Sequence, residues 1–222
     1  MPDIASNIIS LKKEIPSTVK LVAVSKTRSV DEILKAYNTG HKIFGENRVQ
    51  ELLSKKNHLP DDIEWHLVGH LQTNKVRYIV PFISMIESVD TFKLLKIINA
   101  EASKIGRTIA CLLQFHIAKE ETKYGFSMDE VTGMAESSEF RQLKAVRICG
   151  IMGMATFTSD NEQIRSEFRY LYQCYNTLKT RYLNNAESFR EISMGMSGDY
   201  KIAIAEGSTI VRIGSIIFGE RK

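Results

Sequence analysis

The sequence predicts an α/β fold, a single (β/α)₈ TIM barrel with one additional helix before the first strand. Short β-branched runs alternate eight times with longer amphipathic segments. The 222 residues give roughly 28 per unit, enough for a right-handed βα crossover. No repeat, low-complexity stretch or Pro/Gly-rich linker divides the chain, so residues 1–222 are expected to form one domain.

The first half of the chain starts with a helix and then alternates strands with helices. Ile4, Ile8, Leu11 and Ile15 share one face of the opening helix. The run 21–25 is apolar on both faces, which is typical of a buried parallel strand. Further strands are expected at 43–45, 63–68 and 83–89. Helices are expected to begin at Ser29 (with a capping box to Glu32), Asn47, Thr73 and Asp90, and to end at Gly40, Pro81 and Gly106.

The second half continues the same alternation. Strands are expected at 109–116, 146–152, 191–194 and 210–213. A second capping box, Ser127 to Glu130, opens one helix, residues 159–162 open a long one that runs past Tyr175, and 200–206 form a short one. An open doubly wound sheet stays possible, because strand order cannot be deduced from periodicity.

Composition restricts the partners and the compartment. Hydrophobic residues make up 43% of the chain, as in globular proteins. The net charge is +4, but the basic residues are scattered, so no nucleic-acid partner is expected. Three separated cysteines, Cys111, Cys149 and Cys174, are typical of small core residues in a reducing compartment. No signal-peptide pattern and no apolar run of membrane-spanning length occur, so we expect a cytoplasmic protein without membrane contact.

A lysine stands where a TIM barrel carries its chemistry. Lys26 follows the first strand directly, and catalytic groups of such barrels lie where strands end and βα loops begin. Partial burial there favours the neutral amine, which is the form that attacks an aldehyde to give a Schiff base. The alternative is a surface lysine in front of a helix, and Lys26 alone does not decide between the two.

Two Gly/Ser-rich loops near the C-terminus follow the seventh and eighth strands. The first spans 193–199 and contains Ser197; the second contains Gly214 and Ser215. Glycine permits a close backbone approach, and free N–H groups with a hydroxyl suit a phosphate dianion. Each loop alone could be turn and cap chemistry, but both stand where barrels often bind phosphate.

Barrel closure predicts that these features meet. The first strand lies beside the eighth in a closed barrel, which brings Lys26 near Arg212 and Gly214. An amine next to a phosphate site suits a phosphorylated aldehyde, and pyridoxal 5′-phosphate is the candidate.

Several long motifs also resemble one known family. Residues 23–27 (AVSKT), 44–47 (FGEN), 65–75 (WHLVGHLQTNK) and 193–219 are similar to the pyridoxal-phosphate homeostasis proteins. The resemblance covers nearly the whole chain, in order. It implies a fold-type III barrel like the N-terminal domain of alanine racemases, holding the cofactor on Lys26 as an internal aldimine.

The resemblance also implies roles for single residues. Ser197 and the Gly214–Ser215 backbone are implied to hold the phosphate, and Arg212 to face the pyridine nitrogen. Arginine keeps its proton, so the ring would be a weak electron sink. A barrel-wall arginine paired with an acid is the alternative for Arg212. Asn47 is implied to approach the cofactor or, equally, to be an N-cap.

The chain departs from the family pattern at two places. Arg48 stands where many relatives have tyrosine, and His116 where they usually have asparagine; both departures put contacts above the ring in doubt. His66 and His70 have a metal-ligand spacing, but they bracket a strand end without a nearby third ligand, so no metal site is expected.

Three functions remain in competition. The first is a carrier that takes part in intracellular pyridoxal 5′-phosphate homeostasis, without robust catalysis, acting as a monomer, with apo-enzymes that use the cofactor as partners. The second is an amino-acid racemase or related enzyme, which needs acid/base groups on both faces of the substrate carbon. The carrier is favoured because the chain is fully used by the barrel. The third, a Schiff-base aldolase for sugar phosphates, leaves Arg212 without a role.

Overall fold

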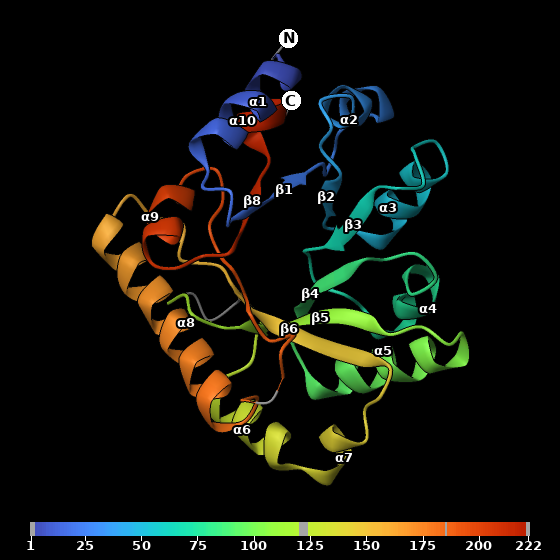
Figure 1. Cartoon of the computed structure of the whole chain (residues 1–222), viewed down its shortest axis with the longest axis vertical. Helices are drawn as coiled ribbons and strands as arrows, with labels where there is room; N and C mark the ends of the chain where they lie inside the picture. The colour runs from blue at the N-terminus through green and yellow to red at the C-terminus, as the bar shows by residue number, and fades with distance from the viewer. Residues whose placement is uncertain (1–2, 120–123, 185, 221–222) are drawn as a thin grey trace.

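Eight parallel strands close into one barrel in the order of the chain (Figure 1). The computed structural model describes residues 3–119, 124–184 and 186–220. Closure confirms the predicted (β/α)₈ barrel and excludes the open doubly wound sheet. The strands are β1 (Lys20–Val24), β2 (Ile43–Glu46), β3 (Glu64–Leu67), β4 (Met85–Val89), β5 (Ile109–Phe115), β6 (Val146–Gly153), β7 (Glu191–Ser193) and β8 (Ile210–Ile213).

Helices surround the barrel. The additional N-terminal helix is present, and it lies beside the last helix (Figure 1), where Asn7 Nδ2 donates to the Ile217 carbonyl at 3.0 Å. The helices are α1 (Ile4–Glu14), α2 (Val30–Tyr37), α3 (Val49–Lys56), α4 (Val76–Ile79), α5 (Phe92–Lys104), α6 (Met128–Glu136), α7 (Ser138–Arg141), α8 (Asn161–Arg181), α9 (Tyr200–Ala205) and α10 (Ser215–Phe218), with the 3₁₀ turn η1 (Thr73–Lys75).

Two predicted helix starts are confirmed in detail. Ser29 and Ser127 each accept the N–H of the residue three positions on, and Glu32 and Glu130 each bond back to the serine N–H.

Two other predicted starts are wrong by one residue. Arg48, not Asn47, is at the N-cap position of α3, and it gives no side-chain cap bond. Thr91 caps α5 in place of Asp90. The start of α8 lies within the predicted range 159–162, with Asp160 as its N-cap.

Apolar side chains pack on both sides of the barrel wall. The larger core lies between strands and helices. The smaller core fills the barrel interior and consists of Val22, Val68, Ala110, Leu112, Cys149, Met152 and Ile210. Cys111, Cys149 and Cys174 are buried and free, as expected for core cysteines.

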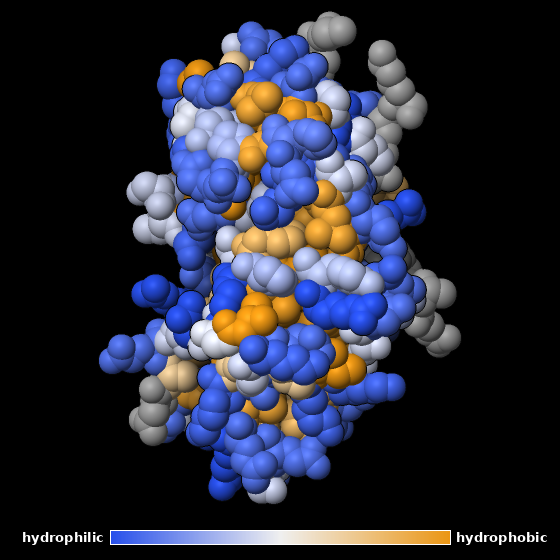
Figure 2. Space-filling view, turned by 90° about the vertical axis from the view of Figure 1, so that its right-hand side faces the viewer, coloured by the Kyte–Doolittle hydropathy of each residue, from blue (hydrophilic) through white to orange (hydrophobic). Residues whose placement is uncertain are grey.

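The face that carries α2 to α5 is mostly hydrophilic, with hydrophobic residues in separate patches (Figure 2). None of the described helices combines the length and apolar character needed to cross a bilayer.

Candidate functional site

Lys26 stands at the rim where the strands end. It follows β1 by two residues and is half-buried. β1 pairs with β2 on one side and with β8 on the other, where Val22 lies opposite Arg212 and Ala23 opposite Ile213. The residues that follow β2 and β8 are therefore the nearest rim neighbours of Lys26.

The loop after β8 presses against the end of β1. A Cβ added at Gly214 would lie 3.1 Å from the Val24 carbonyl oxygen. Only a small residue allows this approach, which brings the β8 loop to within two residues of Lys26. The segment that carries Lys26 and the loop after β8, which were predicted to meet through barrel closure, thus lie next to each other in space.

The loops after β7 and β8 contact each other. The Gly214 N–H donates to Ser197 Oγ at 3.3 Å. Since Ser197 accepts this bond, its own O–H is the group that can donate to an anion. Ser215 is the first residue of α10, and the first hydrogen bond of this helix runs from Ile217 N to the Gly214 carbonyl at 3.0 Å. The Ser197 hydroxyl and the backbone N–H groups at the start of α10 are therefore the groups that could donate hydrogen bonds to a phosphate.

Glycines give the β7 loop its shape. Gly195 has a φ of +97°, and a Cβ there would lie 2.6 Å from the Ala203 Cβ. At Gly198 an added Cβ would meet nothing within 4 Å, so this part of the loop faces open space. The loop thus combines a closely packed support at 195 with room for a ligand group at 198.

Arg212 lies in the barrel interior within a buried polar group of residues. We call Arg212, Ser193, Glu87 and His66 the Arg212 cluster. The guanidinium donates to Ser193 Oγ and, at 2.9 Å, to the Gly153 carbonyl, and its Nη1 lies 3.8 Å from Glu87 Oε2. Glu87 also accepts from Ser193 Oγ at 2.5 Å and bonds His66 Nδ1 at 2.6 Å.

The Arg212 cluster holds charges in the interior. Burial by itself raises the pKa of Glu87, but His66, Arg212 and Ser193 outweigh it, and the pKa lies below its usual value. Burial lowers the pKa of Arg212, while Glu87 opposes this shift, and arginine stays protonated. Arg212 thus has the acid partner that the alternative reading required, and its fixed charge also points to a role at the site.

Glu87 was not among the predicted site residues, and Ser193 was predicted to belong to the loop 193–199, whereas its hydroxyl bonds Glu87 and Arg212. The available signal was an acid in the middle of the apolar run 83–89. Buried acids are rare unless they are paired, so this position predicts a partner without identifying it.

The remaining predicted residues lie elsewhere on the rim. Asn47 follows β2, is half-buried and packs against Gly69, where a Cβ would lie 2.4 Å from the Asn47 carbonyl oxygen. Arg48 is exposed at the start of α3, and His116 is half-buried after β5. His66 Nδ1 bonds Glu87, and His70 Nδ1 bonds Asp90 at 2.6 Å.

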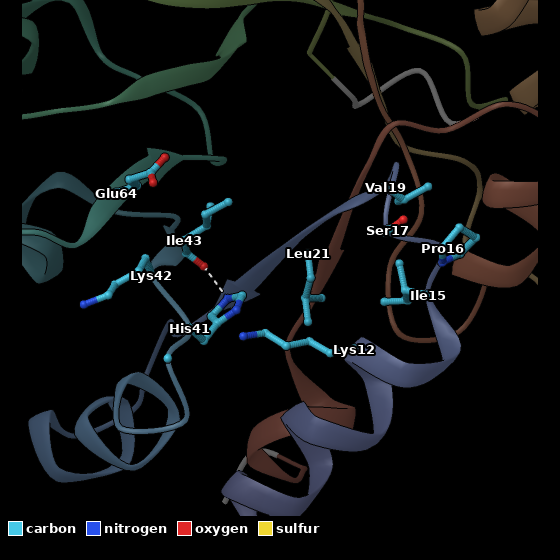
Figure 3. Close-up of a pocket in the computed structure, with 11 residues that line it drawn as sticks. Lys12, Ile15, Pro16, Ser17, Val19, Leu21, His41, Lys42, Ile43 and Glu64 are labelled. Carbon is cyan, nitrogen blue, oxygen red and sulfur yellow. Dashed lines mark hydrogen bonds between the residues drawn. The ribbon is translucent and has the colours of Figure 1, made fainter.

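One cavity lies away from this rim. It measures about 420 Å³ and lies at the opposite end of the barrel, between α1 and the starts of β1, β2 and β3 (Figure 3). There the His41 ring contacts the Ile43 carbonyl at 2.8 Å, and the Lys12 amine lies beside the ring. Burial, with the charge of Lys12, lowers the pKa of His41 to about 4, so the ring is neutral at pH 7.

A smaller hollow of about 240 Å³ lies at the carboxyl end of the strands. Its lining residues are Asn47, Arg48, Val49, Gln50, His70, Gln72 and Lys75. Other groups at this end of the barrel fit a phosphorylated aldehyde: an amine, a hydroxyl and backbone N–H donors follow β1, β7 and β8, and the buried guanidinium of Arg212 lies within β8.

Comparison with known proteins gives the family. The model of the family "Alanine racemase, N-terminal domain" matches residues 1–222. The chain is 39% identical over 204 residues to the pyridoxal phosphate homeostasis protein of Aquifex aeolicus, covering 91% of this chain and 87% of the relative. It is 37% identical over 212 residues to the protein of that name from Homo sapiens, covering 91% of this chain and 76% of that one.

Solved structures agree with these relatives. The structure of PipY from Synechococcus elongatus, with PLP bound, has a TM-score of 0.85 and 35% identity, covering 97% of this chain and 100% of that one. An alanine racemase of Clostridium difficile has a TM-score of 0.71 and 16% identity, and the match covers 99% of this chain and 56% of the racemase. At that identity the racemase shares the fold alone.

Proposed function

The chain belongs to the alanine racemase N-terminal domain family, and from this premise we propose that it binds pyridoxal 5′-phosphate on Lys26 and takes part in intracellular homeostasis of this cofactor. The relatives named above support the homeostasis role, and PipY with PLP bound supports the cofactor. We further propose that residues 1–222 form one cofactor-binding domain.

The observation that carries this proposal is the contact between the ends of β1 and β8. Gly214 approaches the Val24 carbonyl oxygen and also bonds Ser197. Lys26 follows Val24 by two residues. The amine of Lys26 and the backbone of Gly214 thus belong to segments at opposite ends of the sequence, and the closure of the barrel brings these segments together.

Each residue has a stated task in this proposal. Lys26 holds the cofactor covalently through its amine, and Ser197 with the Gly214–Ser215 backbone holds the phosphate. Arg212 stands at the ring nitrogen, and Asn47 contacts the cofactor from the β2 side. Bound pyridoxal 5′-phosphate supplies an electrophilic aldehyde carbon and an electron-withdrawing ring.

The carrier is favoured over a racemase by the charge of Arg212. Glu87 and Ser193 hold the guanidinium in place, and arginine does not release its proton to a ring nitrogen. The ring then withdraws electrons weakly, so carbanion chemistry is disfavoured.

The proposal includes a compartment and partners. Three free, buried cysteines agree with the reducing cytoplasm. As a carrier, a monomer would hand its cofactor to apo-enzymes that require it.

The test is to load the protein with pyridoxal 5′-phosphate, reduce it with borohydride and map the labelled peptide. We expect one label, on Lys26, and an absorbance band that is lost in Lys26→Ala while circular dichroism stays unchanged. A label on another lysine would refute the assignment of Lys26.

The carrier role has its own measurement. Loaded protein should activate an apo-enzyme that depends on the cofactor, and it should not racemise amino acids. Substantial racemisation by the pure protein would replace the carrier with the enzyme.

A further inference from the structure

A buried lysine in the last turn of α3 lies on the outer side of the barrel wall. We call Lys55, Glu46 and Glu51 the Lys55 cluster. Lys55 Nζ lies 2.8 Å from Glu46 Oε1 and 2.6 Å from Glu51 Oε1. Lys55 and Glu46 are buried, whereas Glu51 is half-buried. Lysine and glutamate are almost never fully buried unless they are paired, so this cluster calls for a physical reason.

The Lys55 cluster bonds the residues on both sides of Lys26. Glu46 Oε1 accepts from Ser25 Oγ at 2.7 Å, and Lys55 Nζ donates to the Ser25 carbonyl at 2.8 Å. On the other side, Glu51 Oε1 accepts the Thr27 N–H. These three bonds fix the backbone immediately before and after Lys26.

The backbone at this place is in an unusual conformation. Thr27 has a φ of +66°, and it is the one described residue other than glycine with a positive φ. This region is unfavourable for a β-branched side chain, and such conformations persist where the surroundings enforce them. The bond from Thr27 to Glu51 is one such constraint, and a turn bond from Arg28 N to the Ser25 carbonyl at 3.0 Å is another.

The cluster is poorly suited to stability alone. Glu46 Oε2 is buried and has no hydrogen-bond partner in the part of the chain that the structure describes. Burial raises the pKa of Glu46, although Lys55 and Ser25 oppose the shift. Apolar side chains of similar size often replace a buried ion pair without loss of stability. A purely structural role therefore leaves the choice of these charges unexplained.

We propose that Lys55, together with Glu46 and Glu51, is a positioning group that fixes the backbone of Ser25 and Thr27 and so sets the direction in which the Lys26 side chain enters the barrel mouth. The inference rests on the proposed function, because it takes Lys26 as the residue that holds the cofactor. The cluster lies on the far side of the wall and acts through the backbone, without touching the cofactor.

The variant that tests this is Lys55→Met, which keeps the length of the side chain and removes its charge. Its matched control is Lys35→Met, an exposed lysine in the last turn of the neighbouring helix α2. The readouts are the dissociation constant for pyridoxal 5′-phosphate and the pH midpoint at which the absorbance of the bound cofactor changes. Both are measured beside the melting temperature of the apo-protein.

We expect Lys55→Met to bind the cofactor about tenfold more weakly and to shift the pH midpoint. Lys35→Met should match the wild type in both, and Lys55→Arg should recover part of the affinity. A folded Lys55→Met protein with wild-type affinity and pH midpoint would overturn the inference.

A second variant keeps the test decisive if Lys55→Met does not fold. Glu51→Ala removes the acceptor for Thr27 N–H at a half-buried position and leaves the Lys55–Glu46 pair. Weaker binding with an unchanged melting temperature supports positioning; unchanged binding contradicts it. If the wild type itself takes up no cofactor, the proposed function fails, which is a different result from either.

Discussion

The two ends of the barrel differ in what they bury. The amino end has the larger cavity, about 420 Å³, beside a histidine that burial keeps neutral. The carboxyl end has a hollow of only about 240 Å³. Two glycine loops and Lys26 lie at the rim of the barrel at this end, outside the lining of that hollow. This end also has two buried charged clusters, one around Arg212 inside the wall and one around Lys55 outside it.

The difference teaches that the size of a hollow does not identify the chemical site here. At the amino end the buried His41 beside the cavity is neutral, and the buried Glu191 at the start of β7 is paired with the exposed Lys20 at 2.6 Å. At the carboxyl end the chain buries Glu87 with a lowered pKa beside Arg212, although desolvating charges is costly. Ionised groups in the interior are thus the stronger indication of function.

The largest expected effect tests the buried charge at the carboxyl end. Arg212→Met leaves the Glu87 carboxylate without its guanidinium, and we expect the free energy of unfolding to fall by about 3–5 kcal/mol. Urea denaturation of the apo-protein measures this. The double variant Glu87→Gln with Arg212→Met should lose clearly less, because no unpaired charge stays buried.

The comparison has a control at the other end. Lys12 lines the amino-end cavity and is exposed, so Lys12→Met should change stability by at most about 0.5 kcal/mol. Equal losses in the single and double Arg212 variants would contradict the ion-pair explanation.

A smaller effect tests the neutral histidine at the amino end. The pKa of His41 is lowered to about 4 in the folded chain, so between pH 6.5 and 4 the unfolded chain binds more protons. The contribution of His41 to the free energy of unfolding is therefore complete above pH 6.5. It falls by about 3 kcal/mol in all as the pH falls towards 4.

The variant His41→Asn isolates this contribution, because asparagine does not titrate. Wild-type stability should fall more steeply than that of His41→Asn between pH 6.5 and 4, while cofactor affinity at pH 7.5 stays the same. Parallel pH curves would mean that His41 has the same pKa in the folded and the unfolded chain, and would contradict the lowered pKa.

The smallest effect compares two glycines within one loop at the carboxyl end. Gly195→Ala places a Cβ at a φ of +97° and 2.6 Å from the Ala203 Cβ, and it should cost about 2 kcal/mol. Gly198→Ala adds a methyl group in open space and should cost less than about 0.5 kcal/mol.

These two variants also separate support from binding. Thermal melting should single out Gly195→Ala, whereas cofactor titration should respond to both, since position 198 faces the proposed ligand. An unchanged cofactor affinity of Gly198→Ala would contradict the proposal that the phosphate binds at this loop.

Local patterns in the sequence determined much of the fold. Alternation, apolar runs and two capping boxes placed eight strands and most helices, because these features depend on residues within four positions of one another. The predicted cap of α3 was wrong: Arg48 is at the N-cap position without a side-chain cap bond, so the capping preference of Asn47 did not set the start of this helix.

Tertiary structure alone decided the surroundings of the candidate site. The sequence indicated Lys26, Ser197 and Gly214, since lysine after a strand and glycine loops are local signals. Glu87 and Lys55 were missed, although both contact segments beside the site. The partners of Glu87 lie on other strands, and Lys55 joins its helix neighbour Glu51 to Glu46 on β2 and to the Ser25 carbonyl after β1. Only barrel closure, with its fixed register, brings the groups from different strands together.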